Sequence, residues 1–308
     1  AYLKTYWPLE FMTSLMNSDE KDVERLSFLI REAKELGIEV LPPEINTSYD
    51  GFVPEGEEKI RFGLRAIKNV GSNVVRAIIT ERNQNGIFAD LSDFLSRISY
   101  PDLNKKSLEA LIKSGALDRL GERARLLENM ETLLLRHREA ARLANGAQSS
   151  LFGESHKFSN DLNLKEAPPA SQEEKLAWEK ELLGLFISGH PLAKYQELLA
   201  RQKMNIKMIK SLKAGTPIIV GGIIEDLKKV LTKQSQPMLF LKLADFTDSI
   251  ETVVFPRLLF SNPGVFQPDA CVVIKGTVSL RSGNPSIICD EARRLEERNE
   301  TKKEILSN

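Results

Sequence analysis

Several residue types and patterns are scarce in this chain of 308 residues. Its two cysteines, Cys271 and Cys289, lie in apolar runs typical of strands, so we expect buried thiols in a reducing cytoplasm rather than a disulfide or a metal pair. No apolar run approaches membrane-spanning length, which argues against a membrane partner. A signal peptide is absent, and the opening residues read like the middle of a domain, so we expect a cytoplasmic fragment of a longer protein.

Net charge is also absent, because 43 Lys and Arg residues balance 43 Asp and Glu residues. A global charge argument for nucleic-acid binding therefore fails. The charge is nevertheless unevenly distributed. Residues 60–121 hold ten basic and six acidic residues, whereas residues 1–59 hold six and thirteen. We therefore expect a basic surface confined to residues 60–121.

Sequence patterns of catalytic sites are missing too: there is no phosphate-binding loop, nucleophile triad, zinc spacing or dinucleotide fingerprint. Two-metal phosphoryl transfer needs clustered carboxylates at strand ends, and we find no such cluster. His190 lies in a Gly-Pro turn without a neighbouring carboxylate, cysteine or second histidine, which favours a hydrogen-bonded turn residue. We predict no catalytic residue and no metal site in this chain.

The patterns that are present indicate two kinds of structure. Apolar residues recur at helical spacing over much of residues 1–199, whereas residues 216–291 read as strands. Five strands of this spacing, with a short helical insert at residues 257–260, match an oligonucleotide-binding (OB) barrel. We therefore predict a multidomain α+β fold, in which a helical region precedes a five-stranded OB-fold β-barrel. The expected strands are residues 217–224, 238–246, 250–255, 271–280 and 285–290.

Residues 60–121 contain two similar helical units. The first reads GLRAIKNVGSNVV at residues 63–75, and the second reads SLEALIKSGAL at residues 107–117. Each unit has an apolar helix, a lysine, a small residue and a glycine, and we expect Ser72 to cap the helix that follows the first turn. Two such units form a helix-hairpin-helix pattern, in which turn amides and a lysine hold a phosphate of the DNA backbone. The residues predicted to bind duplex DNA are Lys68, Asn69, Gly71, Ser72, Lys113, Ser114 and Gly115.

An ordinary helix C-cap is the alternative for either turn. A lysine that is followed closely by a glycine also ends many helices that bind nothing. Two copies within about fifty residues, flanked by further basic residues, favour contact with backbone phosphates.

A Leu-Phe pair follows the long amphipathic helix that we expect over residues 122–143. It lies in the string QSSLF at residues 148–152, before a polar, proline-containing stretch that extends to Ser171. Leu151 and Phe152 either fold back onto their neighbours or anchor the chain in an apolar pocket of a partner. In the second case Gln148 would hydrogen-bond at the edge of that pocket.

The barrel has its own candidate residues for single-stranded DNA. We expect Lys228, Lys229 and Lys233 on the loop between the first two strands, where lysines could follow phosphates. Lys242 adds a charge, and Phe240 or Phe255 could stack on a base. The alternative is a core role for Phe240, because one alternating set of residues 238–241 must face the interior.

Five passages resemble the alpha subunit of bacterial DNA polymerase III: residues 1–11, residues 37–46 (GIEVLPPEIN), residues 60–64 (IRFGL), QSSLF at 148–152, and ELLGLFISGHPL at residues 181–192. The last is the most specific of them. One departure is Asn69, where the family usually has glycine. Asparagine tolerates the left-handed backbone, so we expect the turn to form.

The resemblance implies a division of the chain into six parts. These are the end of the fingers (1–59), a tandem helix-hairpin-helix domain (60–145), a linker with a clamp-binding peptide (146–171), a helical connector (172–214), the OB fold (215–292) and a tail (293–308).

The resemblance also implies partners and a function. The partners would be double- and single-stranded DNA, the bacterial sliding clamp and other replisome subunits. In that family the catalytic aspartates lie N-terminal to Ala1, so Mg²⁺ is expected for the full-length polymerase and no cofactor for this chain. We therefore predict a DNA-binding and clamp-binding part of a replicative DNA polymerase that does not polymerise alone. A main replicase and a translesion relative both fit these residues.

Two other functions remain open at this point. The first is a stand-alone nucleic-acid-binding repair or interaction module without a polymerase. The second is a nuclease or ligase that uses the hairpins as a scaffold, which predicts magnesium-dependent cleavage or joining of DNA by the isolated chain.

Overall fold

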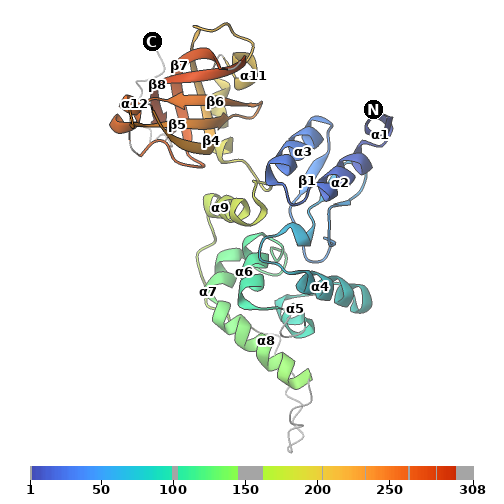
Figure 1. Ribbon diagram of the computed structural model, residues 1–308. Helices are drawn as coiled ribbons and strands as arrows, with labels where there is room; N and C mark the ends of the chain where they lie inside the picture. Colours follow the sequence, from blue (N-terminus) through green and yellow to red (C-terminus); the bar gives the residue numbers. More distant parts are fainter. Residues whose placement is uncertain are drawn as a thin grey trace, which may run out of the picture. The chain divides into compact units, whose positions relative to one another are not determined.

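The computed structural model describes residues 2–98, 103–144, 162–202, 204–232, 234–262, 264–281 and 283–295. It consists of two units, Ala1–Gly189 and His190–Asn308 (Figure 1). A helical region is followed by a closed five-stranded barrel, so the predicted fold class is confirmed. The division between the units falls inside the stretch expected as a helical connector, residues 172–214. No helix in the described ranges is both long and apolar enough to cross a bilayer.

The first unit consists of helices with one small sheet. The sheet has the order β1-β3-β2, with β1 parallel and β2 antiparallel to β3. The elements of the first unit are α1 (Tyr2–Tyr6), α2 (Pro8–Ser18), α3 (Val23–Glu35), β1 (Glu39–Leu41), β2 (Val53–Pro54), β3 (Lys59–Arg61), the 3-10 helix η1 (Leu64–Ala66), α4 (Ser72–Asn85), α5 (Leu91–Arg97), α6 (Lys105–Lys113), α7 (Arg123–Glu128), α8 (Met130–Ala144) and α9 (Gln172–Leu183).

One buried apolar cluster extends through the first unit, from Leu9 in α2 to Leu185 after α9. Phe52 and Phe62 meet edge to face within it, with ring centroids 4.7 Å apart. The Asn17 side chain donates to the Phe52 carbonyl and accepts from the Phe52 amide, both at 2.8 Å. Helix α2 is thereby fixed against β2 by apolar contact and by satisfied backbone groups.

The long helix expected over residues 122–143 is two helices, α7 and α8. The Asn129 side chain donates to the carbonyls of Arg125 and Lys165 and accepts from the Lys165 amide. Such side-chain bonds compete with the helical backbone pattern. Asn129 therefore interrupts the helix and holds the returning chain near Lys165.

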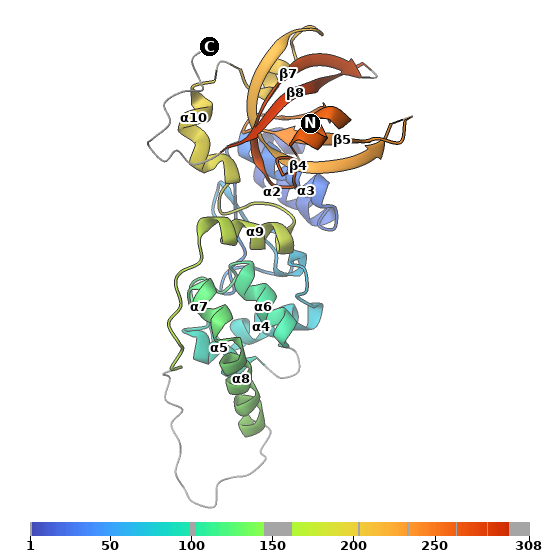
Figure 2. The same ribbon diagram turned by 90° about the vertical axis from the view of Figure 1, so that its left-hand side faces the viewer.

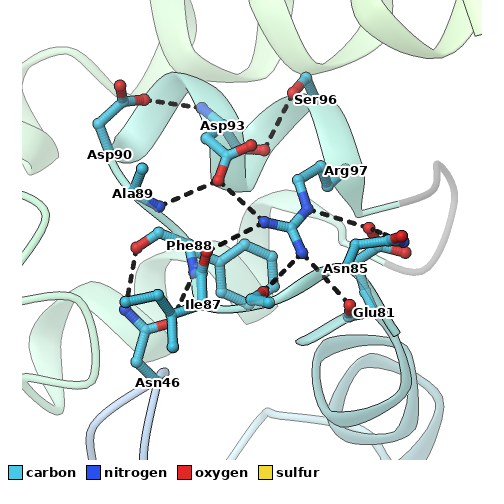
Figure 3. Close-up of polar contacts among 11 residues, drawn as sticks. Asn46, Glu81, Asn85, Ile87, Phe88, Ala89, Asp90, Asp93, Ser96 and Arg97 are labelled. Atoms are coloured by element: carbon cyan, nitrogen blue, oxygen red, sulfur yellow. Dashed lines mark hydrogen bonds and ion pairs between the residues drawn. The ribbon is translucent and has the colours of Figure 1, made fainter. Parts of the chain in front are cut away.

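Arg97 joins the end of α4 to α5 (Figure 3). Its guanidinium donates to the carbonyls of Glu81, Gly86 and Ile87 and pairs with the carboxylates of Glu81 and Asp93. It also lies over the Phe88 ring, 4.6 Å from the centroid. Arg97 therefore ties the last turn of α4 and the two residues that follow it to α5.

The second unit is a barrel. Three short helical segments precede its first strand in the sequence, and a fourth lies between its third and fourth strands. The strands have the order β4-β5-β6-β8-β7, and all five are labelled in Figure 1. Gly276 lies at an irregularity of β7, where a Cβ would be 2.2 Å from the Ile288 carbonyl oxygen, so only glycine fits. The elements are η2 (Pro191–Tyr195), α10 (Gln196–Ala200), α11 (Ile206–Ile209), β4 (Pro217–Leu231), β5 (Pro237–Ala244), β6 (Ser249–Val254), α12 (Pro256–Ser261), β7 (Cys271–Arg281) and β8 (Asn284–Arg294).

Candidate nucleic-acid interface

The first predicted turn, residues 68–72, lies at the surface. Lys68, Asn69, Gly71 and Ser72 are all exposed. Asn69 has φ +69°, so it adopts the left-handed conformation expected of it. The turn leads into α4, a helix of 14 residues whose N-cap, Gly71, provides no side-chain hydrogen bond. The first amides of α4 are therefore not capped by a side chain and are open to an anion.

Two details of this turn differ from the prediction. Gly71, not Ser72, is the N-cap, and Ser72 is the first helical residue. Gly71 has φ −75°, which any residue can adopt, and a Cβ there would meet nothing within 4 Å. Glycine therefore contributes open space in front of the α4 amides, rather than an unusual backbone angle. The helix before the turn is only the three-residue η1.

The second predicted turn, at residues 113–115, is closed. Ser114 has no exposed surface, and its hydroxyl donates to the Leu111 carbonyl. Gly115 is left-handed at φ +85°, and a Cβ there would lie 2.3 Å from Arg123 Nη2. Lys113 Nζ is 2.6 Å from Glu109 Oε1. These residues leave no room for a phosphate at Ser114 and Gly115, so we do not include this turn in the interface proposed below.

Helix α7, which follows the second turn, provides its own anion. The Glu122 carboxylate accepts from the amides of Arg125 and Ala170. Burial on its own would raise the pKa of Glu122, but hydrogen bonds from the Ala170, Arg125 and Ala124 amides and the charge of Lys175 lower it below its usual value. The carboxylate therefore occupies the place that a phosphate would take at a helix N-terminus.

We expect Glu122→Ala to destabilise the first unit by about 1 kcal/mol at pH 7, because a cap is lost. The folded-state pKa of Glu122 is lowered, so its contribution is complete above the unfolded pKa of about 4.3 and is lost as the pH falls through the folded value. In urea unfolding, the difference in free energy of unfolding between Glu122→Ala and wild type should therefore be large at pH 7 and small at pH 3. Exposed Glu128→Ala is the control, and a pH-independent loss in Glu122→Ala would contradict the assignment.

The predicted barrel residues do not all lie on one face. Lys228 lies opposite Phe240, and Lys242 lies opposite Glu251, so these four side chains share the outer face. Lys229 lies opposite buried Leu239 and is therefore on the other face of the ribbon. Strand β4 extends to Leu231, so Lys228 and Lys229 belong to a strand, although the polar sequence there favoured a loop.

Carboxylates neutralise part of the charge on this outer face. Lys242 Nζ lies 3.1 Å from Glu225 Oε2. Arg281, the last residue of β7, places Nη1 2.7 Å from Glu251 Oε1 and its guanidinium 4.0 Å from the Phe240 ring centroid. Lys228 is exposed and has no ion pair with any described residue.

Sequence reasoning missed Arg281. Its only signal is an arginine directly before a Ser-Gly turn between two predicted strands. Phe255, the other predicted stacking residue, is exposed and lies between β6 and α12. The remaining predicted site residues, Gln148, Leu151, Phe152 and Lys233, lie outside the described residues.

Two domain families match the chain. A helix-hairpin-helix motif matches residues 37–127, and an OB-fold nucleic acid binding domain matches residues 218–295. The first match begins within the stretch expected as the end of the fingers, and the domain boundaries stay predictions. Both matches belong to domain types that support nucleic-acid binding.

Curated relatives match most of the chain. The DNA polymerase III subunit alpha of Thermus aquaticus is 38% identical over 261 residues, which are 83% of this chain and 21% of that protein. The subunits of Mycobacterium tuberculosis H37Rv and Aquifex aeolicus are each 34% identical and cover 94% and 96% of this chain. The predicted resemblance is confirmed. The chain spans about a fifth to a quarter of the length of these relatives.

Proposed function

We propose that this chain, similar over most of its length to DNA polymerase III alpha subunits, is a DNA-holding and clamp-binding part of a replicative DNA polymerase. The first unit would hold duplex DNA at the Lys68 turn, and the barrel would guide a single strand. Two further parts of this proposal are contacts with other replisome subunits and a cytoplasmic location. The observation that supports it best is the open turn in front of α4.

The Lys68 turn combines three properties that suit a phosphate. It is exposed, its helix N-terminus lacks a side-chain cap, and Lys68 has no ion pair with any described residue. The Lys68 amide donates to the Leu182 carbonyl at 2.9 Å, so α9 fixes the turn from behind. A fixed set of amides beside a lysine recognises the sugar-phosphate backbone and reads no base.

The QSSLF string lies between two anchored stretches of the first unit. Before it is α8, and after it the chain returns to α7 through Asn129 with Lys165 and through Arg125 with Glu166. We propose that Gln148, Leu151 and Phe152 dock on a bacterial sliding clamp. Such a tether would raise the effective concentration of the polymerase at the primer end and so increase processivity.

We assign no chemical step to this chain. Magnesium would serve the polymerase chemistry of a longer protein, and the described residues include no group of three His, Cys, Asp or Glu side chains that could hold a metal ion. A stand-alone binding module without a polymerase is the second candidate, since both matched domains are of nucleic-acid-binding types.

The two lysines of the hairpins give a matched test of duplex binding. Lys68→Gln should weaken duplex binding about fivefold and reduce the slope of log affinity against log salt by about 0.9, because one phosphate contact is lost. Lys113→Gln should leave both quantities unchanged, since its ammonium already pairs with Glu109 at a closed turn. Fluorescence anisotropy with a labelled duplex across a salt series measures both quantities.

Equal losses in the two variants would contradict the assignment of the contact to the first turn. An unchanged salt slope in Lys68→Gln would remove the hairpin from the duplex interface altogether.

A further inference from the structure

Arg281 covers Phe240 on the outer face of the barrel, and we infer that the guanidinium plane of Arg281 is the surface on which an unpaired base stacks. The inference rests on the proposed binding of a single strand by the barrel. It adds the group that contacts the base and the class of ligand, an unpaired nucleobase.

The contact geometry indicates which group is available to a base. The Arg281 Cζ atom lies over the Phe240 ring, 4.0 Å from its centroid, which is a cation–π contact distance. The guanidinium therefore occupies the ring face that a base would need. The Arg281 side chain itself is 51% exposed, so a ligand can reach it from the solvent. Guanidinium planes, like aromatic rings, stack on bases.

Glu251 positions this plane. Its Oε1 atom accepts from Arg281 Nη1 at 2.7 Å, while Phe240 supports the inner side. An arginine side chain that is held at two points loses less conformational freedom when a ligand binds. Glu251 is thus a positioning residue, and Arg281 with Phe240 forms a two-layer platform.

Charge has a small part in binding at this platform. Glu251 neutralises Arg281, and Glu225 neutralises Lys242. Of the three cations Lys228, Lys242 and Arg281, Lys228 therefore lacks a carboxylate partner among the described residues. Stacking then supplies most of the attraction. Stacking is tolerant of sequence, because every base has a π face, and it requires a base that is not already paired and covered in a duplex.

Comparing the affinities for an oligonucleotide that has bases and for one that lacks them distinguishes stacking from phosphate contact. The probes are a labelled deoxythymidine oligomer and an abasic oligomer of the same length, measured by anisotropy with the whole chain. Wild type should prefer the oligomer with bases by about tenfold. Arg281→Lys keeps the charge but removes the plane, so it should lose most of that preference at an unchanged salt slope.

Two further variants complete the test. Arg293→Lys, an exposed arginine on β8, is the matched control and should keep the preference. Phe240→Leu should lose only part of it, because the support of the plane is weakened. An Arg281→Lys variant that keeps the full preference, or a Phe240→Leu variant that alone abolishes it, would overturn the inference.

Failure of the inference can be told from failure of the proposed function. If wild type shows no preference for bases but Lys228→Gln still weakens binding to both oligomers, the barrel binds a single strand by its phosphates and the stacking inference is wrong. If neither the presence of bases nor Lys228→Gln changes the affinity, the barrel does not bind a single strand, and that part of the proposed function is wrong as well.

Discussion

Glu179→Ala is expected to lower the free energy of unfolding of the first unit by about 3 kcal/mol, because buried Arg123 loses one of its two carboxylate partners and two backbone amides lose their acceptor. Glu179 lies on α9 with no exposed surface. Its Oε1 atom is 3.4 Å from both terminal nitrogens of Arg123, and its Oε2 atom accepts from the amides of Ile187 and Ser188. Alanine would remove all four of these contacts.

The charge left behind is that of Arg123, which is 3% exposed. Burial on its own would lower the pKa of Arg123, but the carboxylates of Asp118 and Glu179 raise it above its usual value. The guanidinium therefore stays charged, and in the variant it retains Asp118 as its carboxylate partner. The amides of Ile187 and Ser188 also lose their acceptor, which adds to the cost.

Urea unfolding followed by circular dichroism measures this effect. Glu181→Ala is the matched control, since Glu181 lies two residues further along the same segment and is exposed. Glu179→Gln should fall between alanine and wild type, because the amide oxygen still accepts from Ile187 and Ser188 while the charge is lost. An alanine variant within about 0.5 kcal/mol of wild type would show that Glu179 does not hold α9 in place.

The contacts between Arg123 and Glu179 explain why the two hairpins differ in structure although their sequences are similar. Lys68 lies three residues before Gly71 and Lys113 lies two residues before Gly115, and this spacing does not indicate which turn is open. The second turn is closed by Arg123 and by Glu179, which is 56 residues further along the chain than Arg123. Only tertiary packing brings α9 beside α6, as Figures 1 and 2 show. The open first turn was predictable, and the closed second turn was not.

The strands of the barrel were predictable because their pattern is local. Alternation of apolar residues, as at Leu239, Leu241 and Leu243, is a local pattern that identifies a strand and its buried face. The polar end of β4, residues 225–231, lacks that pattern, and its strand structure depends on pairing with β5. Arg281 escaped prediction because its contact with Phe240 joins residues of two strands, β7 and β5, that lie far apart in the sequence.

Changing both Leu151 and Phe152 to alanine is expected to abolish binding to a bacterial sliding clamp. If the two side chains fill an apolar pocket, each contributes roughly 1.5–3 kcal/mol of burial, so their joint loss lowers the affinity by at least about 100-fold. A few anchors of this kind carry most of the binding energy of a short peptide. Pull-down with a purified clamp, followed by surface plasmon resonance, measures the loss.

Ser149→Ala with Ser150→Ala is the matched control, since it changes two residues of the same string without touching Gln148, Leu151 or Phe152. This control should bind the clamp as wild type does. Duplex affinity should be unchanged in both double variants, because the Lys68 turn belongs to a different part of the chain. Clamp binding that survives the loss of Leu151 and Phe152 would remove the peptide from the proposed function, while the Lys68 and Arg281 assignments would stand or fall on their own measurements.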